Sequence, residues 1–193
     1  MKAIVLASSS VYRRAILDKT GLTYQSISPD INENRQIGEH ARDLVARLSL
    51  EKAKKIAQQR PNSLIIGSDQ VAVLAQDVLC KPLTEAKAIQ QLTLCAGNKV
   101  TFLTGLCLYD SNEQSYQLEV VPFSVHFRPL TAHEIRRYIA LEKPLDCAGS
   151  FKVEGLGISL FEKLSGDDFN SLIGLPLICL LGMLREKGIS PLS

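Results

Sequence analysis

The chain begins with the stretch that decides its fold, Ile4-Val5-Leu6-Ala7-Ser8-Ser9-Ser10-Val11-Tyr12-Arg13-Arg14. The four apolar residues at its start predict a short buried strand. The three serines that follow are typical of residues that cap a helix, and the residues from Tyr12 to Leu17 suit its first turns. The stretch therefore predicts a strand that passes through a serine turn into a helix.

The start of this helix is a predicted anion site. A helix N-terminus carries unpaired backbone N–H groups and a partial positive charge. Arg13 and Arg14 add planar guanidinium groups that match the geometry of a phosphate. The alternative, a capped surface helix whose arginines are merely solvated, stays open on these residues alone.

Length and composition place the chain among ordinary globular proteins. Its 193 residues suit one domain, 1–193, or two closely merged lobes. A net charge of +2 with no long basic run argues against a nucleic-acid partner. No apolar run reaches the roughly 18 residues that span a membrane, and the N-terminus does not read as a signal peptide. The five cysteines show no C-x-x-C spacing, so we expect a reducing cytoplasm and neither a disulfide framework nor a zinc site.

Strands and helices alternate along the chain without repeats. The expected strands are 4–7, 23–27, 63–66, 71–74 paired with 78–79, 100–109, 116–127 and 158–163; the expected helices cover 12–17, 41–59, 84–95, 131–141 and 175–186. The expected helix 131–141 opens with a capping box. Because strands 100–109 and 116–127 share a short turn, the sequence predicts an α/β fold with a mixed, largely antiparallel sheet.

Three further clusters carry possible chemistry. Asp69 follows the strand 63–66 in Gly67-Ser68-Asp69-Gln70, where a backbone bend would expose it. An acid there suits a general base or a ligand for a hard cation, although a turn-forming aspartate is the plain alternative. Lys52 and Lys81 suit phosphate contacts or simple solvation. The glycine-rich stretch 146–157 would let the backbone pass close to a ligand, or form an ordinary loop.

Taken in this order, the clusters resemble the Maf family of nucleotide pyrophosphatases. The matching stretches are residues 6–10 with 13–14, Glu33, 51–53, 67–69, 81–82, 104–105, 148–149, 155–157 and 174–176. Residues 67–70 and 147–152 carry a finer resemblance to the branch of 7-methyl-GTP pyrophosphatases. The resemblance implies an elongated α/β fold, with helices around the sheet and a central cleft, related to inosine-triphosphate pyrophosphatases.

The chain departs from the family pattern at three positions. Val11 stands where the family usually has proline, and Cys80 stands where glycine is common. Tyr12 stands where the nearest branch commonly has tryptophan. A tyrosine keeps the aromatic face but reduces its area, so we expect this change to affect affinity and not the type of reaction.

The resemblance implies hydrolysis of a nucleoside triphosphate to the monophosphate and pyrophosphate. The residues expected at the phosphates are Ser8, Ser10, Arg13, Arg14, Lys52 and Lys81. Asp69 is the expected acid that activates water. Glu33 and Asp69 are the expected ligands of a divalent metal cation, Mg²⁺ or Mn²⁺.

Recognition of the base can be argued separately. Methylation at N7 makes guanine cationic, and the ring of Tyr12 would stack on it with a cation–π contribution of about 0.5–2 kcal/mol. Glu154 would accept the two N–H donors of guanine, and Gln70 would hold its carbonyl or ribose side. The plain alternative is a packed Tyr12 and a solvated Glu154.

Other functions stay open on the sequence. The chain could be a pyrophosphatase for UTP, dTTP or other non-methylated nucleotides. It could also be a non-catalytic, nucleotide-binding regulator of cell division. The expected partners are the nucleotide and, from the family, a second copy in a homodimer; no membrane partner is expected.

Overall fold

The computed structural model describes residues 2–193, which form two compact units. The first unit contains the residues up to Asp69 together with 104–121 and 168–193, and the second contains 70–103 and 122–167. Three strands continue from one unit into the other: β3 (Ser63–Leu74), β5 (Lys99–Asp110) and β6 (Ser115–Phe127). The seven strands form one sheet in the order β2-β1-β3-β5-β6-β7, with β4 paired to β3. The predicted mixed α/β class is therefore confirmed.

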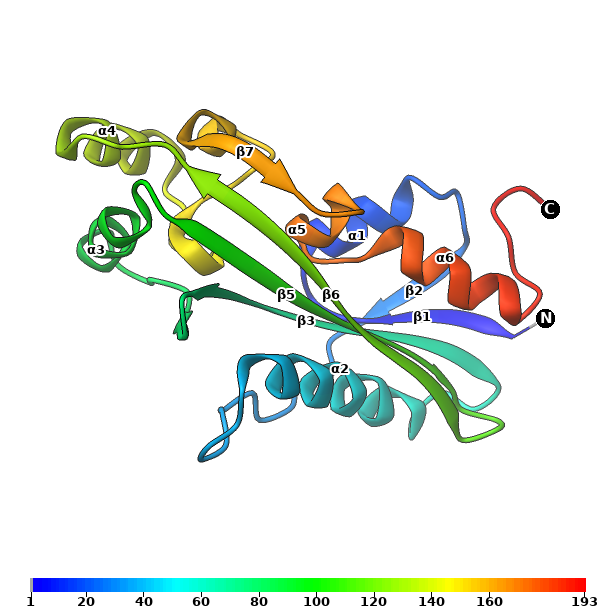
Figure 1. Cartoon of the computed structure of the whole chain (residues 1–193). Coiled ribbons are helices and arrows are strands. Elements are labelled where there is room, and N and C mark those ends of the chain that lie inside the picture. The colour runs from blue at the N-terminus through cyan, green and yellow to red at the C-terminus, as the bar shows by residue number, and fades with distance from the viewer. Residues whose placement is uncertain (1) are drawn as a thin grey trace. The chain divides into compact units, whose positions relative to one another are not determined.

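The sheet of the first unit starts from a parallel trio. β1 (Ala3–Ala7) pairs in parallel with both β2 (Tyr24–Ile27) and β3. Figure 1 shows α2 (Ala41–Ala57) on one face of this sheet, and α1 (Val11–Asp18), α5 (Phe169–Ile173) and α6 (Leu177–Glu186) on the other. Both faces of these strands are thus covered, as expected for parallel strands.

Two hydrophobic clusters fill the space between the sheet and its helices. Leu6, Ile66 and Leu106 point to the side of α1 and α6 and pack there against Leu17 and Leu180. The intervening residues of the same strands, Val5, Ile65 and Cys107, pack against Ala53 and Ile56 of α2. Successive side chains on a strand point to opposite faces. The continuous apolar runs of these strands therefore serve two cores at once.

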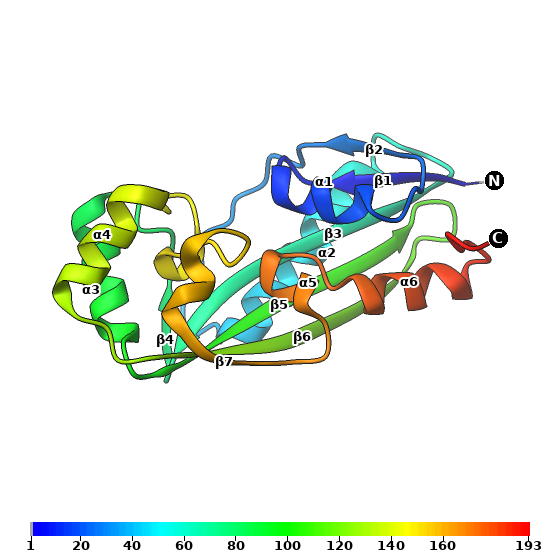
Figure 2. The same cartoon turned by 90° about the horizontal axis from the view of Figure 1, so that it is seen from above.

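The second unit has its own core. It contains β4 (Asp77–Leu79), α3 (Glu85–Cys95), α4 (Ala132–Glu142), the short 3₁₀ helices η1 (Ala148–Ser150) and η2 (Leu156–Leu160), and β7 (Phe161–Ser165). Figure 2 shows α3 and α4 side by side. Four aromatic rings meet edge to face with centroids 4.8–5.7 Å apart: Phe102, Phe127, Phe151 and Phe161. Such contacts add to the stabilisation that the buried area provides.

Several local predictions are confirmed. Ser10 is the N-cap of α1, and its hydroxyl oxygen accepts from the backbone N of Arg13. Thr84 caps α3, and Thr131 with Glu134 forms the complete capping box of α4. The pairing of residues 71–74 with 78–79 is found as the antiparallel ladder between β3 and β4. Among residues 2–193, no helix is both long enough and apolar enough to cross a membrane.

The expected strand 158–163 is found only in its second half. Residues 161–163 belong to β7, whereas residues 156–160 form η2, because local bonds close these turns: the backbone N of Phe161 donates to the carbonyl of Ile158, and Oγ of Ser159 donates to that of Leu156 at 2.7 Å.

The expected helix 175–186 is confirmed as α6, which begins two residues later. The short helix α5 before it was not expected; Asp168 connects the two helices, because its carboxylate accepts from the backbone N of Asn170 in α5 and of Ile178 in α6.

Candidate active site

Glycines on β3 and β5 bring α2 unusually close to the sheet. A Cβ atom at Gly67 would lie 2.1 Å from the carbonyl oxygen of Ser49, and one at Gly105 would lie 2.3 Å from that of Val45. Only a residue without a side chain fits at such distances. The backbone of α2 therefore rests directly on these two strands.

This close approach brings Lys52 of α2 to Asp69. Asp69 lies two residues after Gly67 on β3, so both face α2. The Nζ atom of Lys52 donates to Oδ1 of Asp69 at 2.6 Å. Both residues are buried, with exposed fractions of 5% for Lys52 and 8% for Asp69.

The expected bend that exposes Asp69 is therefore wrong. β3 continues as regular strand through Gly67 and Asp69 to Leu74. The glycine serves the close contact with α2 and not a turn. A buried carboxylate is tolerated here because the ammonium group of Lys52 compensates its charge.

Glu33 brings a second carboxylate to the same lysine. It comes from the irregular segment 28–40, and its Oε1 lies 2.8 Å from Nζ of Lys52. Its side chain is 58% exposed, in contrast to Asp69. The two acids predicted to act together thus meet at one ammonium group.

Arg13 and the serines lie at the start of α1, in the same unit. Nε of Arg13 donates to the carbonyl oxygen of Gly174 at 2.8 Å, and its Nη1 lies 3.5 Å from Oγ of Ser8. Burial lowers the pKa of Arg13, while the charges of Asp69 and Glu33 oppose that shift. An arginine stays protonated under such a shift, so a cation faces the two acids.

The serine hydroxyls keep a donor for a ligand. Oγ of Ser8 accepts from the backbone N of Ser10 at 3.1 Å, and Oγ of Ser10 accepts from that of Arg13 at 3.3 Å. Both bonds use the oxygen as acceptor, so each O–H group can still donate. Donors are what a phosphate requires.

Tyr12 and Arg14 are both half-buried on α1. The charge of Arg14 lowers the pKa of Tyr24, against the larger effects of burial and Asp18 that raise it to about 12. Arg14 therefore lies toward β2, and no described contact joins it to Arg13, Lys52 or Asp69. Its role at the phosphates stays a prediction, as does the role of Tyr12.

The other predicted residues belong to the second unit. Gln70 is half-buried on β3, directly after Asp69. Lys81 is exposed on a segment held at both ends, since the Cys80 carbonyl accepts from Gln91 and the Leu83 backbone N donates to Leu145. Fixed neighbours of this kind present the lysine side chain to solvent from a stable backbone.

Glu154 is exposed on the glycine-rich stretch, which packs tightly on α4. A Cβ atom at Gly155 would lie 2.7 Å from Oε2 of Glu142, and the backbone N of Leu156 donates to Oε1 of Glu142 at 3.1 Å. The backbone N of Lys152 donates to the Tyr138 hydroxyl at 2.9 Å. The loop that carries Glu154 is thus held by specific contacts with α4 and is not a flexible linker.

Comparison with known proteins identifies the family of the chain. A sequence profile described as Maf-like protein matches residues 3–187. The chain belongs to the Maf family. The glycines of its motifs at 67 and 105 are those that bring α2 onto the sheet.

Individual relatives cover almost the whole Maf chain. It is similar to the 7-methyl-GTP pyrophosphatases of Pseudomonas aeruginosa, at 54% identity over 98% of both chains, and of Pseudomonas savastanoi, at 53% over 98% of this chain and 99% of the relative. The protein of the same name from Colwellia psychrerythraea is 49% identical over 100% of this chain and 96% of the relative.

A solved structure shares the fold of this Maf chain. The Ham1 protein of Staphylococcus aureus superposes with a TM-score of 0.55 over 96% of this chain and 100% of that one. The two sequences are 14% identical, so the likeness concerns the fold alone.

Sequence reasoning missed Ser68, which is fully buried beside the predicted residues. Its Oγ lies 2.8 Å from the carbonyl oxygen of Gly105 and 3.0 Å from that of Gly174. Gly174 has a φ of +127°, which favours glycine, and its carbonyl also accepts from Arg13. Ser68 and Arg13 therefore share one acceptor, and the family's glycine at 174 was the signal that could have linked them.

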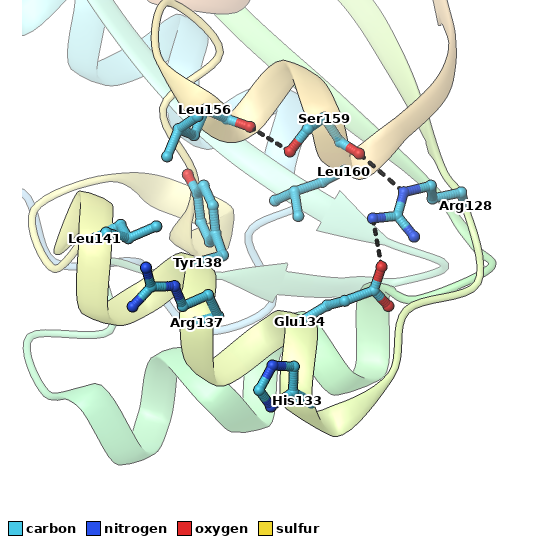
Figure 3. Close-up of a pocket in the computed structure, with 9 residues that line it drawn as sticks. All are labelled: Arg128, His133, Glu134, Arg137, Tyr138, Leu141, Leu156, Ser159 and Leu160. Atoms are coloured by element: carbon cyan, nitrogen blue, oxygen red, sulfur yellow. Dashed lines mark hydrogen bonds and ion pairs between the residues drawn. The ribbon is translucent and has the colours of Figure 1, made fainter.

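A pocket of about 260 Å³ lies in the second unit, between α4 and η2 (Figure 3). Tyr138, Leu156 and Leu160 give it apolar walls, and Arg128 donates to Glu134 at its rim at 2.8 Å. None of the predicted site residues lines it. Of the residues that line the pocket, only Leu156 belongs to a stretch of the Maf pattern, 155–157.

Proposed function

We propose that this Maf protein hydrolyses 7-methyl-GTP to 7-methyl-GMP and pyrophosphate with a divalent metal ion, Mg²⁺ or Mn²⁺. The family and the names of its relatives place the chain among nucleotide pyrophosphatases. The observation that carries the proposal is the ammonium of Lys52, held between Asp69 and Glu33 at 2.6 and 2.8 Å. Two acids and a cation in one place suit water activation beside a phosphate.

The phosphates would bind at the start of α1. The hydroxyl groups of Ser8 and Ser10 would donate to phosphate oxygens, together with the N-terminus of the helix. Arg13 and Lys52 would neutralise their charge, and Lys81 is the expected further cation. Cleavage between the α and β phosphates needs positioned groups and charge neutralisation more than covalent chemistry.

Asp69 is the proposed general base. Lys52 donates to its Oδ1, so we assign Oδ2 to the proton of the attacking water. The proton moves to the carboxylate as the water oxygen bonds to phosphorus, and the anhydride oxygen leaves with pyrophosphate. The ammonium group of Lys52 compensates the negative charge of this buried carboxylate.

The carboxylates of Glu33 and Asp69 fit a hard cation by their chemistry. Both are oxygen donors, and they converge on one position that Lys52 now fills with positive charge. Among residues 2–193, no group of three or more histidine, cysteine, aspartate or glutamate side chains could hold a metal. Phosphate oxygens would complete the set, as is usual for Mg²⁺. When bound, the ion would neutralise charge on the reacting phosphates.

Selection of the methylated base rests on two residues. The ring of Tyr12 would stack on the cationic base, and Glu154 would accept both guanine N–H groups and favour its positive charge. Gln70 would hold the carbonyl or ribose side. Arg14 at the phosphates and a homodimer are further expectations from the family, and a cytoplasmic location is the expectation from the scattered cysteines.

A nucleotide panel tests the reaction. Purified protein is incubated with 7-methyl-GTP, GTP, UTP and dTTP, with Mg²⁺, with Mn²⁺ and with a chelator, and the products are separated by chromatography. We expect fastest turnover of 7-methyl-GTP, release of monophosphate and intact pyrophosphate, and loss of turnover with the chelator. A diphosphate and orthophosphate would reject this reaction. Preference for UTP or dTTP would favour the second enzyme hypothesis, and binding without turnover would favour the regulator.

Two variants test the choice of base. Tyr12→Ala should lower the ratio of kcat/KM for 7-methyl-GTP over GTP by up to about 30-fold, the upper end of the cation–π range. Glu154→Gln should lower the ratio too, since an amide cannot accept from both donors. Tyr116→Ala and Glu162→Gln, which remove an exposed ring and an exposed acid, are the controls. An unchanged ratio in both test variants would reject this recognition and leave the phosphate chemistry standing.

A further inference from the structure

We propose that Arg47 is a positioning residue that holds the segment 28–40 so that Glu33 reaches the site. The inference rests on the role of Glu33 in the proposed function. Arg47 lies on α2, the same helix that supplies Lys52. It would act on catalysis through Glu33 and would not touch the nucleotide.

The guanidinium group of Arg47 grips the segment at two places. Its Nη2 donates to the carbonyl oxygen of Asn34 at 3.1 Å, directly after Glu33 in the chain. Its Nε and Nη2 donate to the two carboxylate oxygens of Glu39 at 2.6 and 2.8 Å. This paired arrangement fixes orientation as well as distance.

Glu39 in turn binds two other residues of the segment. Its Oε2 accepts from the backbone N of Gln36 at 3.0 Å, and its carbonyl oxygen accepts from Nε of Arg35 at 2.6 Å. The hydrogen bonds from Arg47 hold the pKa of Glu39 at about 2, so the pair is charged at neutral pH. A single arginine thus organises both the middle and the end of the segment.

Apolar contacts contribute little to holding this segment in place. Residues 32–38 are all exposed, and Ile37 at the tip is fully so. A segment with little buried apolar area and no regular structure opens easily unless polar contacts hold it. The side chain of Glu33, itself 58% exposed, therefore depends on its neighbours for its position at Lys52.

One rigid helix holds both parts of this arrangement. Arg47 fixes the backbone beside Glu33, and Lys52 receives its carboxylate, while α2 is itself set on the sheet through Gly67 and Gly105. The distance between the two anchors is thus constant. Without Arg47 the segment would sample many conformations, and Glu33 would lie at Lys52 for only a fraction of the time.

The test combines hydrogen exchange with kinetics in the full-length protein. The variants are Arg47→Ala, Arg47→Lys and Glu33→Gln, with Arg42→Ala as the matched control, because Arg42 is an exposed arginine on the same helix. Exchange is measured at the amides of Asn34, Gln36 and Glu39 without nucleotide or added metal. Turnover of 7-methyl-GTP gives kcat, KM and the half-saturating Mg²⁺ concentration.

We expect Arg47→Ala to speed exchange in the segment at least tenfold and to lower kcat roughly 10–100-fold, the range for a misplaced catalytic group. KM should change less than about twofold by the same reasoning, because the phosphate and base contacts remain, and the half-saturating Mg²⁺ concentration should rise. The exchange rate and kcat of Arg47→Lys should lie between those of the wild type and of Arg47→Ala, since an ammonium group cannot bind two carboxylate oxygens and a carbonyl together. Arg42→Ala should match the wild type in every measurement.

Three outcomes would overturn the inference, and they are distinguishable. Unchanged exchange in Arg47→Ala would show that Arg47 does not hold the segment. Faster exchange with unchanged kcat, while Glu33→Gln lowers kcat, would show that the hold does not matter for catalysis. Full turnover in Glu33→Gln would remove the proposed role of Glu33 itself, and positioning it would then have no function.

Discussion

Two groups of opposite charges lie in the first unit, and each surrounds a buried aspartate. Asp69 receives Lys52 at 2.6 Å, with Glu33 on the same lysine. Asp110, at the end of β5, receives Lys2 at 2.5 Å and Lys187 at 3.3 Å. Both aspartates would be costly to bury without their cations.

The two groups differ in what else holds the carboxylate. Oδ1 of Asp110 also accepts from the backbone N of Asn112 and of Glu113, at 3.1 and 3.3 Å, in its own turn. Its lysines come from near the two ends of the chain, and both also contact Glu113. The hydrogen bonds from its own turn, together with the two lysines from near the chain ends, make this group a structural clamp.

Asp69 instead lies within a regular strand, and the ammonium group of the Lys52 side chain holds its carboxylate. A side chain can turn to a new partner when a ligand arrives, whereas a backbone N–H of a turn cannot. The comparison indicates that the ion pair of Asp69 can change partners when a ligand binds, whereas the contacts of Asp110 are permanent. Removing each aspartate should therefore affect different properties.

The largest expected effect is on turnover in Asp69→Asn. Loss of a general base lowers kcat roughly 10²–10⁴-fold. The fold should persist, because Lys52 keeps Glu33 as a partner and the amide still accepts its hydrogen bond. Turnover at saturating Mg²⁺ and thermal unfolding are measured together. A folded variant with wild-type turnover would show that Asp69 is not the base.

How far the sequence could predict this site depends on the kind of residue. Local chemistry was enough for Ser10 and for the capping box at Thr131, because both act within one helical turn. It was misleading at Gly67, since a glycine before an aspartate suits either a bend or a close helix contact. Only packing against α2 decides between them.

Contacts between distant segments were beyond local patterns. The helical spacing of 41–59 predicted the helix but gave no sign that Lys52 is buried on it together with Leu44 and Leu48. Nothing in the polar segment 28–40 indicated that Arg47 binds it, because that pairing joins a loop to a helix through side chains. The ordered family motifs placed Glu33, Lys52 and Asp69 in one set without giving the contacts between them.

A moderate effect is expected on stability in Asp110→Asn. The substitution leaves Lys2 and Lys187 with Glu113 alone, and it removes charge-assisted bonds of the kind that contribute about 1.5–3 kcal/mol each. We expect a loss of about 1–3 kcal/mol in the free energy of unfolding and a fall in Tm on the order of 2–10 °C. Turnover below the transition should equal that of the wild type. Loss of turnover in the folded variant would contradict the division between the two groups.

The smallest effect is a change in how stability depends on acid. Burial alone would raise the pKa of Asp110, but hydrogen bonds from Lys2, Lys187 and its own turn outweigh it and lower the pKa from 3.8 to about 2. A depressed folded pKa means that the unfolded chain binds the proton first as the pH falls. The stabilisation from Asp110 is therefore complete above about pH 4 and is lost as the pH falls towards 2.

Denaturant unfolding at a series of pH values between 5 and 2 measures this contribution. One carboxylate can change the slope of unfolding free energy by at most about 1.4 kcal/mol per pH unit. Wild type should lose stability more steeply than Asp110→Asn in this interval, and the two curves should approach each other at the acid end. Glu39 and Glu134, whose pKa values are also near 2, are present in both proteins and contribute equally to both slopes. Parallel curves would mean that Asp110 is not held in its charged form by the clamp, and the contrast with Asp69 would then rest on turnover alone.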